Sequence, residues 1–122
     1  MMIRKTNPVA GAYRLCNQEI TIYHRKNDDE YTTEYYNAFF DSHKTQSIDK
    51  TGSQEVSQYL IVIPGDVKAQ VGDKVLLGHG KRIREREEWA ELIPSKVENL
   101  IVVRTVDSKY WNGVIAHVEL GG

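Results

Sequence analysis

The chain has 122 residues, which fits one domain with a single core and is too short for two independent domains. Its 16 Lys and Arg residues stand against 17 Asp and Glu residues, a formal net charge of −1, and both signs are spread along the chain. This balance argues against a basic face of the kind that binds nucleic acid through phosphate contacts.

Cysteine content and the lack of membrane signals exclude further classes of protein. The single cysteine, Cys16, excludes an internal disulfide framework and a zinc site made of this chain's cysteines alone, so we expect a small buried hydrophobic residue. No stretch approaches the roughly twenty apolar residues of a membrane span, and the first residues, MMIRKTNPVAG, lack the apolar region of a secretory signal. The sequence therefore predicts a protein that is cytosolic when synthesised and has no membrane partner.

The first part of the chain predicts two strands. After a polar lead-in, EITIYH (19–24) places its side chains alternately on two faces, the period-2 pattern of a half-buried strand. The charged, turn-forming segment 25–34 interrupts this pattern. YYNAFFDSH (35–43) resumes with aromatic residues that favour strands, so we expect the second strand there.

A long polar stretch follows, KTQSIDKTGSQEVSQ (44–58). Its large apolar residues are only Ile48 and Val56, on either side of the turn signal Thr51-Gly52. We interpret 44–58 as an exposed hairpin extension outside the core, with a tip that is mobile in the free protein. We expect this assembly loop to become ordered only against a neighbouring molecule.

The next segment contains Gly-Asp twice, seven residues apart. YLIVI (59–63) is a continuous apolar run typical of a central strand, and PGD (64–66) ends it by fixing φ and removing a backbone donor. After the second Gly-Asp (72–73), VLLG (75–78) predicts another short strand. The intervening residues suffice for a tight connection across one end of a barrel.

Four glycines in this region leave two alternatives. They form either a phosphate-binding loop near Lys74 or Lys81, or the corners of a small β-barrel; they are Gly65, Gly72, Gly78 and Gly80. A Walker loop needs four residues between its first glycine and a Gly-Lys-Ser/Thr triplet that opens a helix, and GHGK (78–81) lacks that spacing. We favour barrel corners, in which Asp66 and Asp73 cap backbone amides.

One helix is predicted, REREEWAELI (84–93), and Pro94 ends it. Trp89, Leu92 and Ile93 share a stripe along one side of this segment. A helix of this length is marginal by itself in water, so we expect it to be docked through Trp89 onto the sheet or onto a neighbouring molecule.

The end of the chain predicts strands again. NLIVVRTV (99–106) is interpreted as one strand, and the last strand runs to about Leu120. Between them lies Asn112-Gly113, the strongest hairpin signal in the chain, because both residues tolerate positive φ. We expect Trp111 to be buried near this hairpin.

The predicted fold class is therefore mainly β. We expect a small β-barrel of about six strands, with a long hairpin extension and one short helix between late strands. A single domain should cover residues 1–122, with 44–58 as the exposed hairpin and 84–93 as the helix.

The histidines are the obvious candidates for metal binding or acid–base chemistry. They are His24, His43, His79 and His117. His117 and the acidic Glu119 lie two positions apart on a presumed strand, but one histidine with one carboxylate falls short of a catalytic zinc set. Structural histidines near the rim of the barrel explain them more simply.

Other catalytic patterns are missing. The acidic cluster Asp28, Asp29 and Glu30 lacks the spaced ligands and the glycine of a calcium loop, so we interpret it as a solvated loop. The sequence contains no Gly-x-Ser-x-Gly elbow, and Cys16 has no setting that would activate a thiol. We therefore predict that the protein is not an enzyme: no catalytic, cofactor-binding or metal-binding residue is assigned, and no cofactor is expected.

Tyrosines offer one further alternative. They could stack the bases of a single strand on an oligonucleotide-binding barrel, but such platforms come with a cationic groove that the sequence does not indicate. Amphipathic strand faces and protein interfaces explain them more simply. They are Tyr13, Tyr23, Tyr31, Tyr35, Tyr36, Tyr59 and Tyr110.

Several collinear segments resemble a known family. NPVAGAYRLCNQEITIYH, YLIVIPGD, VGDKVLLGHG, IPSKV and KYWNGVIAHVELGG together resemble a small family encoded in the structural-gene modules of tailed phages and prophages of Gram-positive bacteria. Its members are usually labelled minor capsid or head–tail connector components. The resemblance covers nearly the whole chain, and the element order is also similar to the head-closure, or stopper-like, barrels beneath the portal.

The resemblance implies a structural role without catalysis. It implies a homo-oligomeric ring that contacts the portal or adaptor and the tail proteins of the same particle, with DNA passing through the lumen without sequence-specific contact. The expected location is the neck of the virion, and the host cytoplasm during assembly. A tail-completion or tail-terminator protein, or a stand-alone β-barrel module that binds a peptide, glycan or nucleic acid, remains the alternative.

Overall fold

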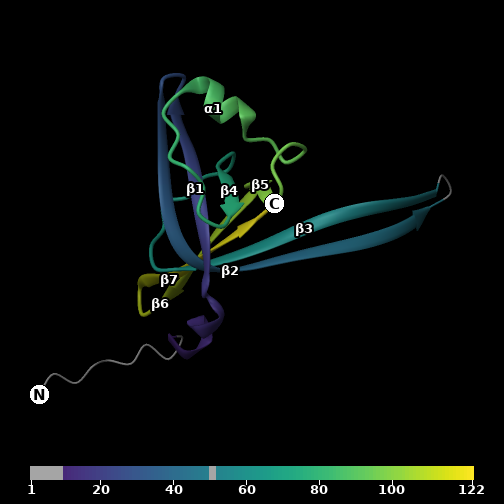
Figure 1. Cartoon of the computed structure of the whole chain (residues 1–122). Coiled ribbons are helices and arrows are strands. Elements are labelled where there is room, and N and C mark those ends of the chain that lie inside the picture. Colours follow the sequence, from purple (N-terminus) through teal and green to yellow (C-terminus); the bar gives the residue numbers. More distant parts are fainter. Residues whose placement is uncertain (1–9, 50–51) are drawn as a thin grey trace, which may run out of the picture.

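A computed structural model describes residues 10–49 and 52–122 of the chain (Figure 1), with side chains described for residues 13–42 and 58–122. A 3-10 helix, η1 (Ala10–Leu15), precedes a sheet of seven antiparallel strands in the order β5-β4-β1-β2-β3-β7-β6. The strands are β1 (Gln18–Asn27), β2 (Glu30–Asp49), β3 (Gly52–Pro64), β4 (Lys74–Leu77), β5 (Leu100–Val102), β6 (Thr105–Trp111) and β7 (Val114–Gly121), and the one α-helix described, α1 (Arg86–Glu91), lies between β4 and β5. The predicted mainly β class is confirmed.

The two outermost strands of the sheet are joined by the chain itself. β5 pairs with β4 and β6 pairs with β7, and only Val103 and Arg104 separate β5 from β6. The Val103 amide donates to the Asp73 carbonyl (2.8 Å), and the Arg104 amide donates to the Gly121 carbonyl (2.7 Å). The segment 99–106, which the sequence predicts as one strand, therefore bends between two strands and curls the sheet into a half-barrel.

The first hairpin is longer than its sequence suggests. β1 continues to Asn27 and β2 begins at Glu30, so most of the charged segment 25–34 is strand and not an interruption. The Asn27 side chain accepts a hydrogen bond from the Asp29 amide (2.8 Å) and closes the turn. Charged residues are tolerated here because the backbone ladder holds this half of the hairpin and the charged side chains are exposed to solvent.

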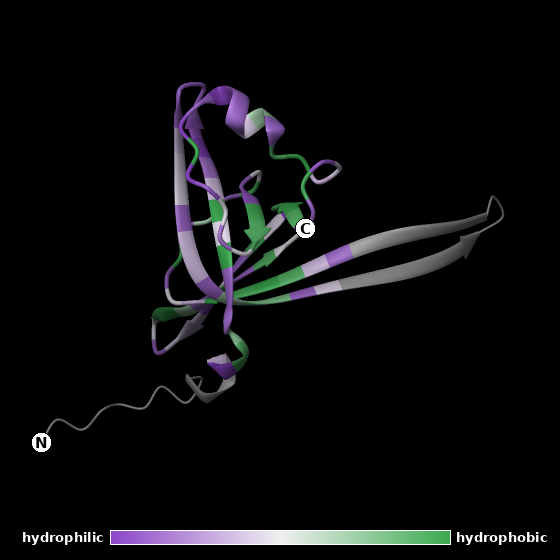
Figure 2. Ribbon diagram, in the orientation of Figure 1, coloured by the Kyte–Doolittle hydropathy of each residue, from purple (hydrophilic) through white to green (hydrophobic). Residues whose placement is uncertain are grey.

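Aliphatic residues from most of the strands form the core. Figure 2 shows apolar residues on the strands at the centre of the sheet and hydrophilic residues over the β1–β2 turn and α1. The main cluster of buried residues consists of Ile20, Ile22, Ala38, Ile61, Ile63, Val67, Val75, Ile101, Val103, Val118 and Leu120. β3 lies between β2 and β7, which confirms the central strand predicted at 59–63.

The predicted corners are confirmed. Gly65 and Gly72 have φ of 94° and 95°, in the left-handed region that favours glycine. Asp73 caps its turn, because its carboxylate accepts from the Gln70 amide (2.9 Å). The described contact of the Asp66 side chain is with the Lys68 ammonium (3.1 Å), so the capping role expected for Asp66 is not what the structure shows.

The predicted Asn112-Gly113 hairpin also forms. It joins β6 to β7, and the two residues have φ of 50° and 78°. Trp111, expected to be buried beside it, is only half-buried, because it lies at the end of the hairpin and outside the core cluster.

α1 is shorter than the predicted 84–93. The Glu85 amide donates to the Glu88 carboxylate (3.2 Å) at its start, and Leu92 caps its end. Trp89 is half-buried and provides the expected anchor: it contacts the ring of Tyr31 and accepts a hydrogen bond at its carbonyl from the Lys74 ammonium (2.8 Å). The helix buries no residue completely, and besides Trp89 its described contacts include the Lys81–Glu88 and Arg86–Asp28 ion pairs.

Trp89→Ala is expected to destabilise the protein by less than the approximately 3–5 kcal/mol of a fully buried tryptophan, because Trp89 is only partly buried. Urea unfolding of Trp89→Ala and of Trp111→Ala, followed by circular dichroism, measures both effects. Unchanged midpoints in both variants would contradict the packing described for the two indoles.

β2 and β3 continue past the rest of the sheet. β1 pairs with β2 only as far as Ala38, and β7 pairs with β3 only from Leu60. Beyond these points β2 and β3 pair with each other, out to Asp49 opposite Gly52, and Figure 1 shows them leaving the sheet together as one long ribbon. We call the ladder from the His43–Gln58 pair outward the arm. The predicted mobile tip, 50–51, lies outside the described residues.

Candidate functional site

The most site-like cluster in the described residues is built on His24 and Asp73. The His24 Nδ1 atom lies 2.6 Å from the Asp73 Oδ1 atom, although the two residues are 49 positions apart. The Asp73 side chain is 3% exposed and the His24 side chain 25% exposed. Asp73 is held by its turn and by pairing of Lys74 with Tyr23 of β1, so the carboxylate reaches the inner face of that strand.

A cavity of about 240 Å³ opens beside this pair. Its lining comes from β1, β2 and the connection between β3 and β4, and consists of Ile22, His24, Lys26, Thr32, Glu34, Val67, Lys68, Gln70 and Asp73. The register pairs Ile22 with Glu34 and His24 with Thr32, so these four side chains share one face of the first hairpin. The sequence marked His24 as a rim histidine and Asp73 as a turn residue, but it carried no signal that the two meet.

Glu34, which lines this cavity, is linked to the partly buried side chain of Tyr36. The Tyr36 hydroxyl donates to the Glu34 carboxylate. Burial, and then this hydrogen bond, raise the pKa of Tyr36 from 10.0 to about 12.

Tyr36 should therefore make the protein less stable as the pH rises from 10.0 to about 12, because the folded protein keeps a proton that the unfolded chain releases. Below this window the contribution of Tyr36 to stability is fully present. Absorbance titration of phenolate and urea unfolding at several alkaline pH values test this. Tyr36→Phe should flatten the decline, and an equally steep decline in Tyr36→Phe would assign it to other groups.

The glycine-rich segment 78–84 crosses the outer face of the first hairpin. Hydroxyl groups of the hairpin hold its backbone: Tyr23 donates to the Lys81 carbonyl (2.9 Å) and Tyr35 to the Gly80 carbonyl (2.8 Å). The Thr21 hydroxyl donates to the Gly78 carbonyl (2.7 Å) and accepts from the Gly80 amide (2.8 Å). We call residues 78–84 the strap.

Lys74 and Lys81, the two lysines considered for a phosphate-binding loop, both contact α1. The Lys74 ammonium lies beneath α1, where it donates to the Trp89 carbonyl and lies 4.2 Å from the centroid of the indole. Burial lowers the pKa of Lys74. Lys81 pairs with Glu88 (3.3 Å). Each lysine thus contacts α1. Gly78 adopts the positive φ (108°) of a corner, as the barrel interpretation expected, whereas Gly80 is a point of close packing against Tyr23.

His117 and Glu119 share a face of β7, as predicted. The His117 Nε2 atom lies 2.9 Å from the Glu119 carboxylate, and its Nδ1 atom lies 2.6 Å from the Tyr13 hydroxyl. Because both ring nitrogens are occupied, this histidine fixes η1 against the sheet. Cys16, expected as a buried residue, is only partly buried; its thiol donates to the Val62 carbonyl (3.6 Å), and burial raises the pKa of the thiol.

The remaining candidates are surface groups or fall outside the described side chains. His79 stacks on Tyr35, with ring centroids 4.0 Å apart, and lies 3.1 Å from the Glu19 carboxylate. In the acidic cluster, Asp28 pairs with Arg25, and its other oxygen lies 3.7 Å from Arg86. The His43 side chain is not among those described. Within 13–42 and 58–122, no three His, Cys, Asp or Glu side chains are grouped to hold a metal ion.

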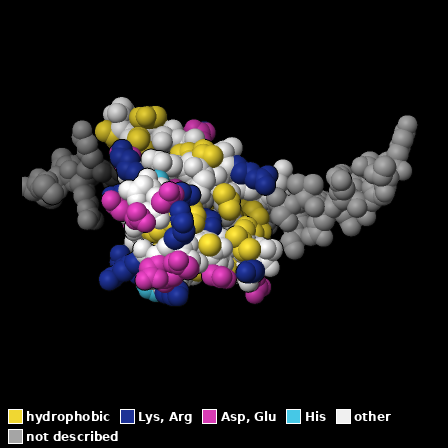
Figure 3. Space-filling model, turned by 90° about the horizontal axis from the view of Figure 1, so that it is seen from above, with side chains coloured by type: hydrophobic (Ala, Val, Ile, Leu, Met, Phe, Trp, Pro, Cys, Tyr) yellow, Lys and Arg dark blue, Asp and Glu magenta, His cyan; other side chains and the backbone are white. Residues whose placement is uncertain are grey.

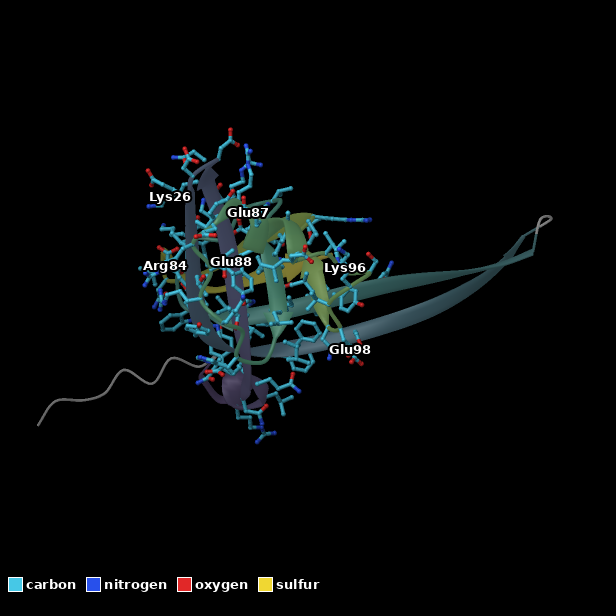
Figure 4. The ribbon with its side chains drawn as sticks, turned by 45° about the horizontal axis from the view of Figure 1, so that its top comes forward. Lys26, Arg84, Glu87, Glu88, Lys96 and Glu98 are labelled. Atoms are coloured by element: carbon cyan, nitrogen blue, oxygen red, sulfur yellow. The ribbon has the colours of Figure 1, made fainter. Side chains whose placement is uncertain are left out.

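Charges of both signs are mixed on the described surface. Figure 3 shows Lys and Arg interspersed with Asp and Glu in the view from above. Figure 4 places Lys26, Arg84, Glu87 and Glu88 on the same side of the molecule, over β1 and α1. This pattern does not form the single-sign patch by which proteins hold nucleic acid phosphates. No helix in the described part of the chain has both the length and the apolar composition for crossing a membrane.

Comparison with known proteins gives one family. The model of a family of unknown function, DUF6751, matches residues 15–122. No curated protein and no solved structure matches the chain. The matched range begins within η1 and contains all seven strands, so the half-barrel, the arm and the cavity beside His24 are all within the family's span.

Proposed function

The chain belongs to the DUF6751 family, and we propose that it is a structural protein of a tailed-phage particle, a subunit of the ring that closes the head at the head–tail junction. It acts without catalysis, cofactor or base recognition. Its partners are further copies of itself, the portal or adaptor above and the tail proteins below.

The observation that carries this proposal is the arm. From the His43–Gln58 pair outward, no third strand of the described residues adds to β2 or β3. A two-stranded ribbon is marginally stable by itself in water, because its backbone ladder is not supported by a packed face. Such a ribbon is stabilised when a neighbouring molecule supplies the missing contacts, as in an assembly.

Two further features support a ring subunit. The continuous β5–β6 segment joins the two outermost strands of the half-barrel, so the body that carries the arm is tied together across its open side. The mixed charges of the described surface favour the passage of DNA past the subunit without retention by its phosphates. The collinear sequence segments that resemble phage connector components agree with both features.

Deletion of the gene in an inducible prophage, followed by electron microscopy of the lysate, tests the proposal. We expect separate tails and unjoined heads that have lost DNA, and rescue by the gene supplied in trans. Tails of abnormal length would move the assignment to the tail terminator. Fully infectious, normal particles would contradict a structural role in the virion.

A further inference from the structure

We propose that the cavity beside His24 and Asp73 binds a small hydroxyl-rich ligand with the size and polarity of one sugar ring. This inference goes beyond the proposed ring function and does not depend on it. It rests on the hydrogen-bonding roles that the fold imposes on the groups around the cavity.

Asp73 determines which ring nitrogen of His24 carries a hydrogen. Both carboxylate oxygens of Asp73 accept hydrogen bonds, one from the Gln70 amide (2.9 Å) and one from the His24 Nδ1 atom (2.6 Å). A neutral imidazole that donates through Nδ1 presents a lone pair at Nε2. No described side chain donates to this Nε2 atom, and it belongs to a residue that lines the cavity. A ligand hydroxyl is the simplest donor for such an acceptor.

The rest of the lining continues this chemistry. Glu34 adds a second acceptor, and Thr32 adds a hydroxyl that both donates and accepts. Donors come from Lys26, Lys68 and Gln70.

The apolar part of the lining is formed by Ile22 and Val67, which are 4% and 9% exposed. They leave a small apolar area facing the cavity, against which part of the C–H face of a sugar ring can pack. Acceptors and donors placed around an apolar surface are the complement of a polyhydroxylated ring.

Other small ligands fit less well. A metal ion would compete with the hydrogen bonds that Asp73 and Glu34 already accept, and the two lysines of the lining would oppose a cation. A simple anion would face the carboxylates of Glu34 and Asp73. The volume of about 240 Å³ lies below the roughly 300–1,000 Å³ of sites for drug-sized molecules, which suits one ring.

A polyhydroxylated ring of this kind occurs both as a free monosaccharide and as the terminal unit of a glycan.

The test uses the full chain, labelled with ¹⁵N, and follows backbone and histidine ring signals by nuclear magnetic resonance. The probes are glucose, galactose, N-acetylglucosamine, ribose and a disaccharide of each hexose, with acetate and Zn²⁺ for comparison. We expect at least one sugar to shift the His24 Nε2 signal with a dissociation constant of about 1 mM, a value typical of weak single-site contacts. Tighter binding of the disaccharide would identify the glycan unit as the source, and equal or weaker binding the free sugar.

His24→Asn is the decisive variant, because its amide can still donate to Asp73 while the Nε2 acceptor is lost. Binding should weaken about tenfold or more, as expected for the loss of one well-placed hydrogen bond. His79→Asn, on the outer face, is the matched control and should bind like the unmodified protein. Glu34→Gln provides a second test at an exposed position that tolerates substitution.

Three results would overturn the inference. They are the absence of shifts with every sugar, undiminished binding in both His24→Asn and Glu34→Gln, and binding of acetate or Zn²⁺ but of no sugar. Because these measurements use the isolated chain, their failure leaves the particle phenotypes of the gene deletion unaffected.

Discussion

Gly80→Ala will strongly destabilise the protein. A Cβ atom built at this position would lie 2.0 Å from the Tyr23 hydroxyl oxygen and 2.8 Å from the Leu76 Cδ2 atom. Tyr23 cannot move aside easily, since it is 1% exposed and its hydroxyl holds the Lys81 carbonyl. We expect a loss of about 3 kcal/mol in the free energy of unfolding, the upper part of the range for overpacked sites.

Chemical unfolding of a matched set measures this effect. Gly65→Ala is the control: its added Cβ meets nothing within 4 Å, so only the positive φ of 94° opposes it, at a cost of about 1–2 kcal/mol. Tyr23→Phe removes the closest clashing atom, so the double variant Tyr23→Phe with Gly80→Ala should lose less stability than the sum of the two single variants. Equal losses for Gly80→Ala and Gly65→Ala would contradict the close packing of the strap.

Ile61→Ala is expected to cost about 2–5 kcal/mol, the range for truncating a buried isoleucine. Ile61 is 0% exposed on the central strand β3, within the main core cluster. Its neighbour Leu60 is 41% exposed, and Leu60→Ala should change the free energy of unfolding by no more than about 0.5 kcal/mol. A similar cost for both variants, measured by urea unfolding, would show that the inward and outward faces of β3 are wrongly assigned.

Local rules predicted those parts of the fold that local chemistry decides. Asn112-Gly113 indicates a tight hairpin because both residues accept positive φ, and the φ values of 50° and 78° agree. The two Gly-Asp pairs indicate corners for the same reason. The apolar run 59–63 indicates a strand inside the sheet, and β3 does lie between two other strands, although only Ile61 and Ile63 of the run are fully buried.

Elements that depend on contacts with residues far away in the sequence could not be predicted from local patterns. The segment 99–106 has the pattern of one strand, and its bend at Val103 is set by the Asp73 carbonyl of another strand connection. The charged residues 25–34 carry loop-like composition, yet the ladder between β1 and β2 continues through them because strand pairing is a backbone property.

The candidate site likewise combines residues that the sequence shows with a contact that only the fold creates. A histidine on a strand and an aspartate in a turn are each visible in the sequence, but the 2.6 Å contact between His24 and Asp73 follows from β4 pairing beside β1. No spacing rule connects residues that lie 49 positions apart. The arm was expected as a hairpin, whereas its lack of a third strand is apparent only from the pairing of β1 and β7.

The central claim is that the arm serves assembly and not folding. The direct test is to replace residues 44–57 by Asn-Gly, which joins the paired residues His43 and Gln58 through a tight turn, and to supply this variant to the gene-deleted prophage. We predict that the shortened chain melts at the same temperature as the full chain, while the lysate still contains unjoined heads and tails. Full rescue of infectious particles by the shortened chain would contradict the claim.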